Sequence, residues 1–170
     1  IHVDAFTHMS NLETLKFEEN NLSIFDKQLI IKNTKIIYLI LESTNLEHFR
    51  ADLSSIYFKE LRFLVLSHNR LKNLTNSYFR GLERLNFLYL DTNQIEFIDS
   101  DALSNLERLD TLGLSENRIR SITSSILLVF EFGCRNLVVK SNPIERFEST
   151  QITNVYAEPN EMKLLIEKIN

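Results

Sequence analysis

The sequence contains little of what usually turns, cross-links or anchors a protein chain. Its 170 residues include three glycines, two prolines, one cysteine and no tryptophan. A single cysteine, Cys134, excludes an internal disulfide framework and a cysteine-rich zinc site. No apolar run approaches the roughly 18 residues that cross a bilayer. A net charge of −4 argues against a nucleic-acid-binding arm or a polybasic membrane anchor.

The side chains that could build a catalytic site are scattered along the chain. His2, His8, His48 and His68 lack the spacing of zinc ligands, and the three glycines cannot form a phosphate-binding loop. Cys134 falls at an apolar position of the repeat described below, where we expect a small buried core residue. We therefore expect no enzyme activity, no cofactor and no metal ion.

Leucine, isoleucine and asparagine are abundant, and their spacing is periodic. The chain has 27 Leu, 17 Ile and 17 Asn residues. Residues 61–74 follow the frame LxxLxLxxNxLxxL, which also fits five other segments when other apolar residues replace some leucines. Consecutive copies lie 24 or 25 residues apart, and their first positions are Leu12, Ile36, Leu61, Leu85, Leu109 and Cys134.

This pattern resembles the leucine-rich repeat family over nearly the whole chain. The 24-residue period is similar to the typical class of these repeats, which occurs mostly in extracellular animal proteins. Typical repeats followed by a helix also resemble the mosquito leucine-rich immune molecules, although the cysteine-rich caps of those proteins are absent here. The resemblance implies an α/β-type solenoid, a curved right-handed superhelix with a parallel sheet on its concave face and a C-terminal helix.

Elementary geometry explains the repeat. Alternating residues of a short strand point to opposite faces, so the leucines of LxL enter a core and the residues between them face solvent. One repeat cannot bury its apolar face alone, and stacking brings parallel strands to about 4.8 Å. A buried amide has enough donors and acceptors to satisfy the backbone of a turn. The column that we expect to do this comprises Asn20, Asn69, Asn93, Asn117 and Asn142, with Thr44 in the second repeat.

We interpret residues 1–170 as a single leucine-rich repeat domain. It consists of a partial repeat (1–11), six repeats (12–147), a degenerate strand (148–160) and a terminal helix (161–170). The helix is predicted because apolar residues recur at helical spacing after Pro159. It either seals the end of the core or begins a longer helix or coiled coil. At the other end the chain begins in mid-repeat, which predicts preceding repeats or self-association through an uncapped end.

The candidate binding surface consists of the strand residues that face solvent. In the middle repeats two adjacent columns of these residues are apolar or aromatic, as interface anchors often are. The alternative is that the aromatic column only stabilises the sheet by stacking. His68 lies one repeat from Asp91, whose carboxylate would favour the imidazolium form. The predicted partner-binding residues are Tyr38, Ile40, Phe63, Val65, Phe87, Tyr89, His68 and Asp91.

Two N-x-S/T sequons, at Asn21 and Asn73, are compatible with secretion. Their number is about what chance gives in a chain this rich in Asn, Ser and Thr, so they are not evidence for it. We expect a non-catalytic module that binds a protein through its concave face, without nucleic acid or a membrane span. The resemblance favours an extracellular protein, secreted or a receptor ectodomain, in innate-immune or receptor-type recognition. The alternative is an intracellular adaptor or scaffold in the cytoplasm.

Overall fold

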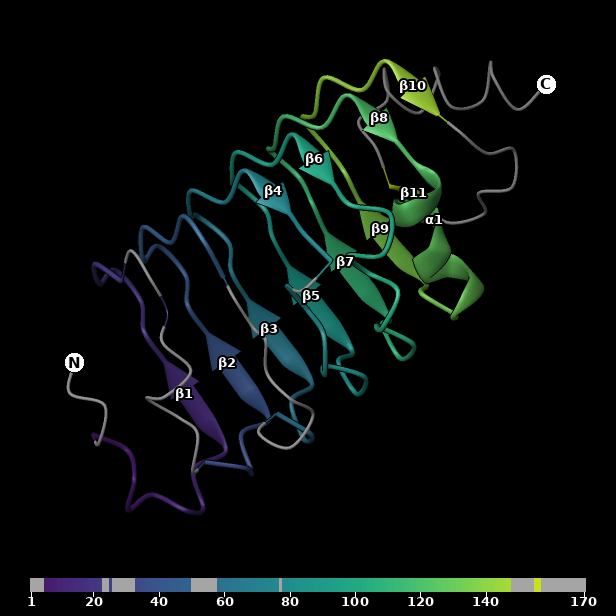
Figure 1. Ribbon diagram of the computed structural model, residues 1–170. Helices are drawn as coiled ribbons and strands as arrows, with labels where there is room; N and C mark the ends of the chain where they lie inside the picture. The colour runs from purple at the N-terminus through teal and green to yellow at the C-terminus, as the bar shows by residue number, and fades with distance from the viewer. Residues whose placement is uncertain are drawn as a thin grey trace.

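The chain winds into a solenoid of stacked turns (Figure 1). The structure is a computed structural model that describes residues 5–22, 25, 33–49, 58–76, 78–147 and 155–156. Each full turn contributes one short strand to a parallel sheet, which confirms the predicted solenoid with a parallel sheet. The predicted terminal helix over 161–170 lies outside the described residues.

Seven strands form the main sheet. Its register pairs equivalent residues of successive repeats, so that Leu39 lies opposite Leu64 and Leu64 opposite Leu88. These middle residues are fully buried, and the residues on either side of them face outward. The strands follow the order β1 (Thr14–Lys16), β2 (Tyr38–Ile40), β3 (Phe63–Val65), β5 (Phe87–Tyr89), β7 (Thr111–Gly113), β9 (Asn136–Val138) and β11 (Val155–Tyr156).

Shorter strands lie along a second edge of the solenoid (Figure 1). β4 (Asn73–Leu74) pairs with β6 (Phe97–Ile98), and β8 (Ser121–Ile122) pairs with β10 (Arg146–Phe147), all in parallel. The helix α1 (Ser124–Glu131) follows β8 and returns the chain to β9. This helix was not predicted from the sequence.

A column of buried asparagine amides connects the repeats. The Asn93 Oδ1 accepts a hydrogen bond from the Leu71 amide at 3.1 Å, and its Nδ2 donates to the carbonyl of Leu66 at 2.9 Å. Both partners belong to the preceding repeat. Nδ2 also donates to carbonyls within its own repeat, those of Leu90 at 3.0 Å and Asp91 at 3.3 Å. The same pattern recurs at Asn69, Asn117 and Asn142.

Two members of the predicted column differ from this pattern. Thr44 is fully buried; its hydroxyl donates to the Leu41 carbonyl at 3.0 Å, and its backbone amide donates to the Asn69 Oδ1 at 3.0 Å. Asn20 is exposed, and its Nδ2 donates to the Glu18 carbonyl at 2.7 Å. The first asparagine of the column therefore lies at the surface, contrary to our expectation of a buried amide.

The turns use a left-handed backbone residue that is not glycine. In every copy of the repeat, the residue before the asparagine position has a φ between 54° and 57°. A non-glycine residue pays about 1–2 kcal/mol for this conformation. The six residues are Glu19, Ser43, His68, Thr92, Glu116 and Ser141. The chain thus turns at each repeat with very few glycines, at a local steric cost that the asparagine bonds next to it help to offset.

Replacing Asn93 with Leu is expected to lower the free energy of unfolding by about 3 kcal/mol or more. The change leaves the Leu71 amide and several carbonyls without partners in the core, and each unsatisfied buried group costs about 1–3 kcal/mol. Denaturant unfolding measures the loss. Asn20→Ala is the matched control, because that side chain is exposed, and it should cost less than about 1 kcal/mol.

Replacing Thr92 with Asn is expected to raise the free energy of unfolding by about 0.5–1 kcal/mol. A β-branched side chain is poorly suited to φ of 54°, whereas Asn tolerates the left-handed region. Thermal or denaturant unfolding measures the gain. Thr111→Asn, in strand β7 and without a positive φ, should bring no gain. An equal effect at both sites would contradict the role of the backbone conformation.

Candidate functional site

Three aromatic rings stack on the solvent-facing side of the main sheet. The centroids of the Tyr38 and Phe63 rings are 4.5 Å apart with their planes at 17°, and those of Phe63 and Phe87 are 4.5 Å apart at 6°. Direct register between β2, β3 and β5 places the rings one strand apart, which is why they stack face to face. Tyr38 is 39% exposed, and the two phenylalanines are half-buried. We call these three residues the aromatic ladder.

A second column runs beside the aromatic ladder, two residues further along each strand. Ile40, Val65 and Tyr89 are all half-buried, so part of each side chain meets solvent. The structure therefore brings six of the eight predicted partner-binding residues together as two adjacent columns on one face. Together the two columns form an apolar strip that is only partly exposed to solvent.

Asp91 has a different environment from the one expected. Its carboxylate folds over the neighbouring strand, where Oδ1 accepts a hydrogen bond from the Ser115 amide at 2.8 Å. A Cβ atom at Gly113 would collide with this carboxylate, so glycine is needed in β7 to make room for it. Burial raises the pKa of the Asp91 carboxyl above its ordinary value of 3.8, although hydrogen bonds to Ser115 act in the opposite direction. Asp91 thus ties two repeats together at the sheet surface.

His68 lies at the rim of the same face but is directed towards the preceding repeat. Its Nε2 is 3.8 Å from the Glu42 Oε1, and its backbone amide donates to the Asp91 carbonyl at 3.0 Å. The side-chain neighbour is therefore Glu42, and the predicted pairing of the imidazole with the Asp91 carboxylate was wrong. Glu18, Glu19 and Ser43 complete a hollow of about 220 Å³ around this pair. The left-handed backbone at His68 explains the difference, because it turns the side chain out of the strand alternation.

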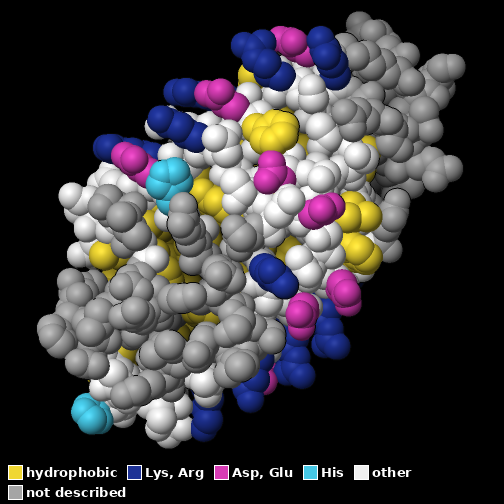
Figure 2. All heavy atoms as spheres, viewed as in Figure 1, with side chains coloured by type: hydrophobic (Ala, Val, Ile, Leu, Met, Phe, Trp, Pro, Cys, Tyr) yellow, Lys and Arg dark blue, Asp and Glu magenta, His cyan; other side chains and the backbone are white. Residues whose placement is uncertain are grey.

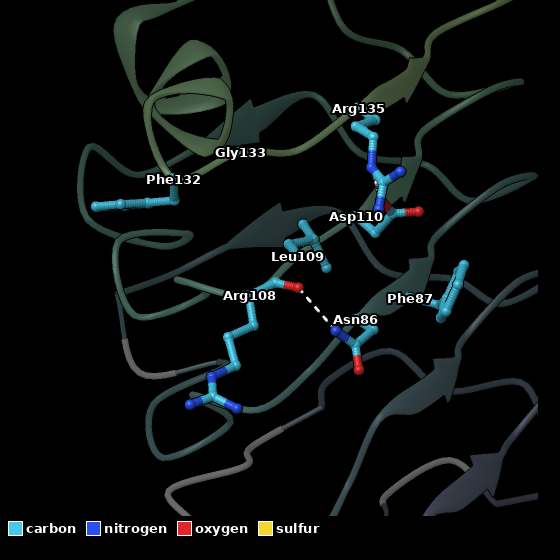
Figure 3. Close-up of a pocket in the computed structure, with 8 residues that line it drawn as sticks. All are labelled: Asn86, Phe87, Arg108, Leu109, Asp110, Phe132, Gly133 and Arg135. Atoms are coloured by element: carbon cyan, nitrogen blue, oxygen red, sulfur yellow. Dashed lines mark hydrogen bonds and ion pairs between the residues drawn. The ribbon is translucent and has the colours of Figure 1, made fainter.

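A second hollow lies where the chain enters strands β5, β7 and β9 (Figure 3). It has a volume of about 290 Å³ and includes Phe87 of the aromatic ladder in its lining. The Arg135 Nε lies 2.6 Å from the Asp110 Oδ1, and the Asn86 Nδ2 donates to the Arg108 carbonyl at 3.0 Å. Small-molecule sites usually enclose about 300–1,000 Å³. This hollow is at the lower limit of that range.

Charged side chains elsewhere pair across neighbouring repeats. In the face shown in Figure 2, Lys and Arg side chains lie mainly along the edges, with acidic side chains beside several of them. Three such contacts are Arg84–Glu60 at 3.0 Å, Arg118–Glu96 at 3.3 Å and Arg120–Glu145 at 2.6 Å. Each pair is well exposed, so each contributes at most about 1 kcal/mol to stability.

The one cysteine of the chain has a buried thiol. Cys134 is buried, and its thiol contacts the carbonyls of Asp110 and Asn136 at 3.5 Å each. Burial raises the pKa of this thiol, which disfavours the nucleophilic thiolate. Within the described ranges there is no group of three or more His, Cys, Asp or Glu residues that could hold a metal ion. No helix among the described residues is long and apolar enough to cross a membrane.

Comparison with known proteins agrees with this architecture. Residues 59–119, in the middle of the solenoid, match the model of the leucine-rich repeat family. That stretch is similar to leucine-rich repeats. The solved structure of a leucine-rich repeat protein from Leptospira interrogans is similar, with a TM-score of 0.69 and 22% sequence identity. The match covers 94% of this chain and 42% of that one, so this chain spans less than half the length of that protein.

The likeness to the solved Leptospira structure concerns the fold alone. In all, 154 chains of solved structures match, while no curated protein matches the sequence. Leucine-rich repeat proteins are typically non-catalytic and commonly bind other proteins.

The residues that sequence reasoning missed are Gly113, whose missing side chain accommodates Asp91, and the Arg135–Asp110 pair. A lone glycine in a column of larger residues was the available signal for the first of these.

Replacing Asp91 with Asn is expected to remove part of the pH dependence of stability. The raised pKa means that the folded state holds the proton more tightly than the unfolded state. The wild-type free energy of unfolding therefore falls as the pH rises from about 3.8 through the folded-state pKa. Asp91→Asn lacks this fall, so its stability relative to the wild type should increase between pH 3 and pH 7. A difference that stays constant over this range, measured by denaturant unfolding, would contradict the assignment.

Proposed function

We propose that this leucine-rich repeat protein is a non-catalytic recognition module that binds a protein partner through the concave face of its main sheet. The contact residues would be the aromatic ladder of Tyr38, Phe63 and Phe87, together with the adjacent column of Ile40, Val65 and Tyr89. His68 would contribute from the rim. Asp91 would act mainly by holding the surface in shape, because its carboxylate is engaged with Ser115.

The observation that carries the proposal is the apolar character of the aromatic ladder and of the column beside it, on the solvent-facing side of the sheet. Solvent-facing positions of a soluble sheet are usually polar, yet two adjacent columns are apolar over three consecutive repeats. Interface anchors are enriched in aromatic residues whose surroundings exclude water. The rings are also preorganised by their own stacking at 4.5 Å, so binding would cost little side-chain entropy.

We further propose that the protein acts outside the cell, in innate-immune or receptor-type recognition. The 24-residue period supports this location, and the exposed sequon asparagines, Asn21 and Asn73, are compatible with it. The alternative is an intracellular adaptor or scaffold, which the same fold would serve equally well. The mass of the protein purified from its natural source, before and after enzymatic removal of N-glycans, discriminates between the two.

Self-association is a further part of the proposal. Among the described strands, β1 pairs on one side only, with β2. An unpaired strand edge can pair with a second copy of the chain. Light scattering at several concentrations tests this, and a monomer throughout would contradict it.

Tyr38→Ala and Phe63→Ala are expected to weaken binding to the natural partner at least about tenfold, because truncating an interface anchor typically costs 2 kcal/mol or more. The partner is first captured by a photo-reactive amino acid at Val65, and its affinity for each variant is then measured by calorimetry. Phe97→Ala is the matched control, because Phe97 is 59% exposed but belongs to β6, outside the main sheet. It should bind like the wild type.

The alternative role of the aromatic ladder predicts a different outcome. If the rings only hold the sheet together, the variants lose stability while their affinity stays unchanged. Phe63 stacks on two rings and Tyr38 on one, so Phe63→Ala is expected to lose about 1–3 kcal/mol of stability and Tyr38→Ala about half of that. Tyr38→Ala is therefore the cleaner variant for the binding measurement.

A further inference from the structure

The sequon at Asn73 begins in strand β4, and the structure describes all three of its residues. Asn73 and Thr75 are exposed, whereas Leu74 between them is fully buried. The acceptor amide and the hydroxyl residue of the sequon therefore face the same way, out of the solenoid. The Asn73 amide makes no hydrogen bond to the other described residues. For Asn21, the structure describes the asparagine but not the third residue of its sequon.

The residue paired with Asn73 on the next strand is an unusually exposed phenylalanine. Direct register in the β4–β6 pair places Phe97 opposite Asn73, so both side chains leave the same face about 4.8 Å apart. Phe97 is 59% exposed, more than any other large hydrophobic residue of the described chain, while its neighbour Ile98 is buried. Beyond Phe97, a hollow of about 180 Å³ extends along Ile119, Thr123 and Ile126.

We propose that Asn73 is an N-glycan acceptor and that the first sugar of the glycan packs on the exposed ring of Phe97. One face of a pyranose ring carries mainly C–H groups, which suit the electron-rich face of an aromatic ring. The glycan would cover the apolar ring and extend over the neighbouring hollow. This inference rests on the proposed extracellular location, because the glycan is added only on the secretory route.

The glycan would also leave the proposed binding face free. Asn73 and Phe97 belong to the short second-edge strands, whereas the aromatic ladder belongs to the main sheet. The sugar would therefore protect the second edge without covering Tyr38, Phe63 or Phe87.

The test uses the full chain carrying Asn21→Gln, which leaves Asn73 as its single sequon. This variant is produced in two forms. Insect cells secrete it behind an added leader peptide, so that it can acquire a glycan, and bacteria produce it without a glycan. Mass spectrometry before and after glycan removal should show one glycan, absent after Asn73→Gln. The melting temperature of the glycosylated form should exceed that of the bacterial form by about 1–4 °C. The same comparison in Phe97→Ala should give a difference near zero.

Several outcomes would overturn the inference. If Asn73 carries no glycan, its assignment as an acceptor is wrong. If the glycan raises the melting temperature equally with and without Phe97, the packing of the sugar on this ring is wrong. Phe97→Leu repeats the comparison if the alanine variant folds poorly, because leucine keeps apolar bulk but lacks the ring. Phe132→Ala, a half-exposed ring on another part of the surface, is the control and should leave the rise unchanged. NMR adds an independent readout, because a stacked ring shifts the sugar protons upfield. This shift should be present when Phe97 is present and absent in Phe97→Ala.

This experiment separates the inference from the proposed location. A protein that is intracellular in its natural source would still acquire the glycan behind a leader peptide. Failure of the proposed location would therefore appear only in the mass of the natural protein.

Discussion

The structure depends on hydrogen bonds that one repeat supplies to the repeat before it. Each buried asparagine amide fills a place where the backbone leaves a strand and can form no sheet bonds of its own. Asn93, for example, satisfies Leu71 and Leu66 of the preceding repeat and Leu90 of its own repeat. Because the same geometry recurs at Asn69, Asn117 and Asn142, the strands keep a common register.

That register is also what creates the candidate binding surface. Rings stack at 4.5 Å only if their strands are neighbours without a shift, as β2, β3 and β5 are. The rim of the surface depends on the turns instead. His68 follows a strand in a left-handed conformation, which brings its imidazole to Glu42 rather than to Asp91. The face and its rim are therefore positioned by two different devices, a sheet register and a column of unusual backbone angles.

The strands, the buried leucines and most of the asparagine column could be predicted from the sequence because each depends only on spacing. Features that depend on contacts between side chains could not. The Asp91 carboxylate lies over Gly113, which is 22 residues further along the chain. The sequence does not show which way the Asp91 side chain points, so this contact could not be predicted. The helix α1 was missed because its apolar residues Ile126 and Leu127 also fit the repeat, at the positions that Ala102 and Leu103 occupy 24 residues earlier. The exposure of Asn20 could not be predicted either, because its spacing is the same as that of the buried members of the column.

The direction of the asparagine bonds has a consequence for the synthesis of the chain. Each amide serves a turn that was made 22 to 28 residues earlier, as Asn69 serves Leu46 and Leu41. A turn that has just left the ribosome therefore lacks its hydrogen-bond partner until the next repeat follows. At about 5–20 residues per second, this delay lasts on the order of one to five seconds. The nascent solenoid thus always ends in one incomplete repeat, and its last turn is the place where a chaperone would find open backbone groups.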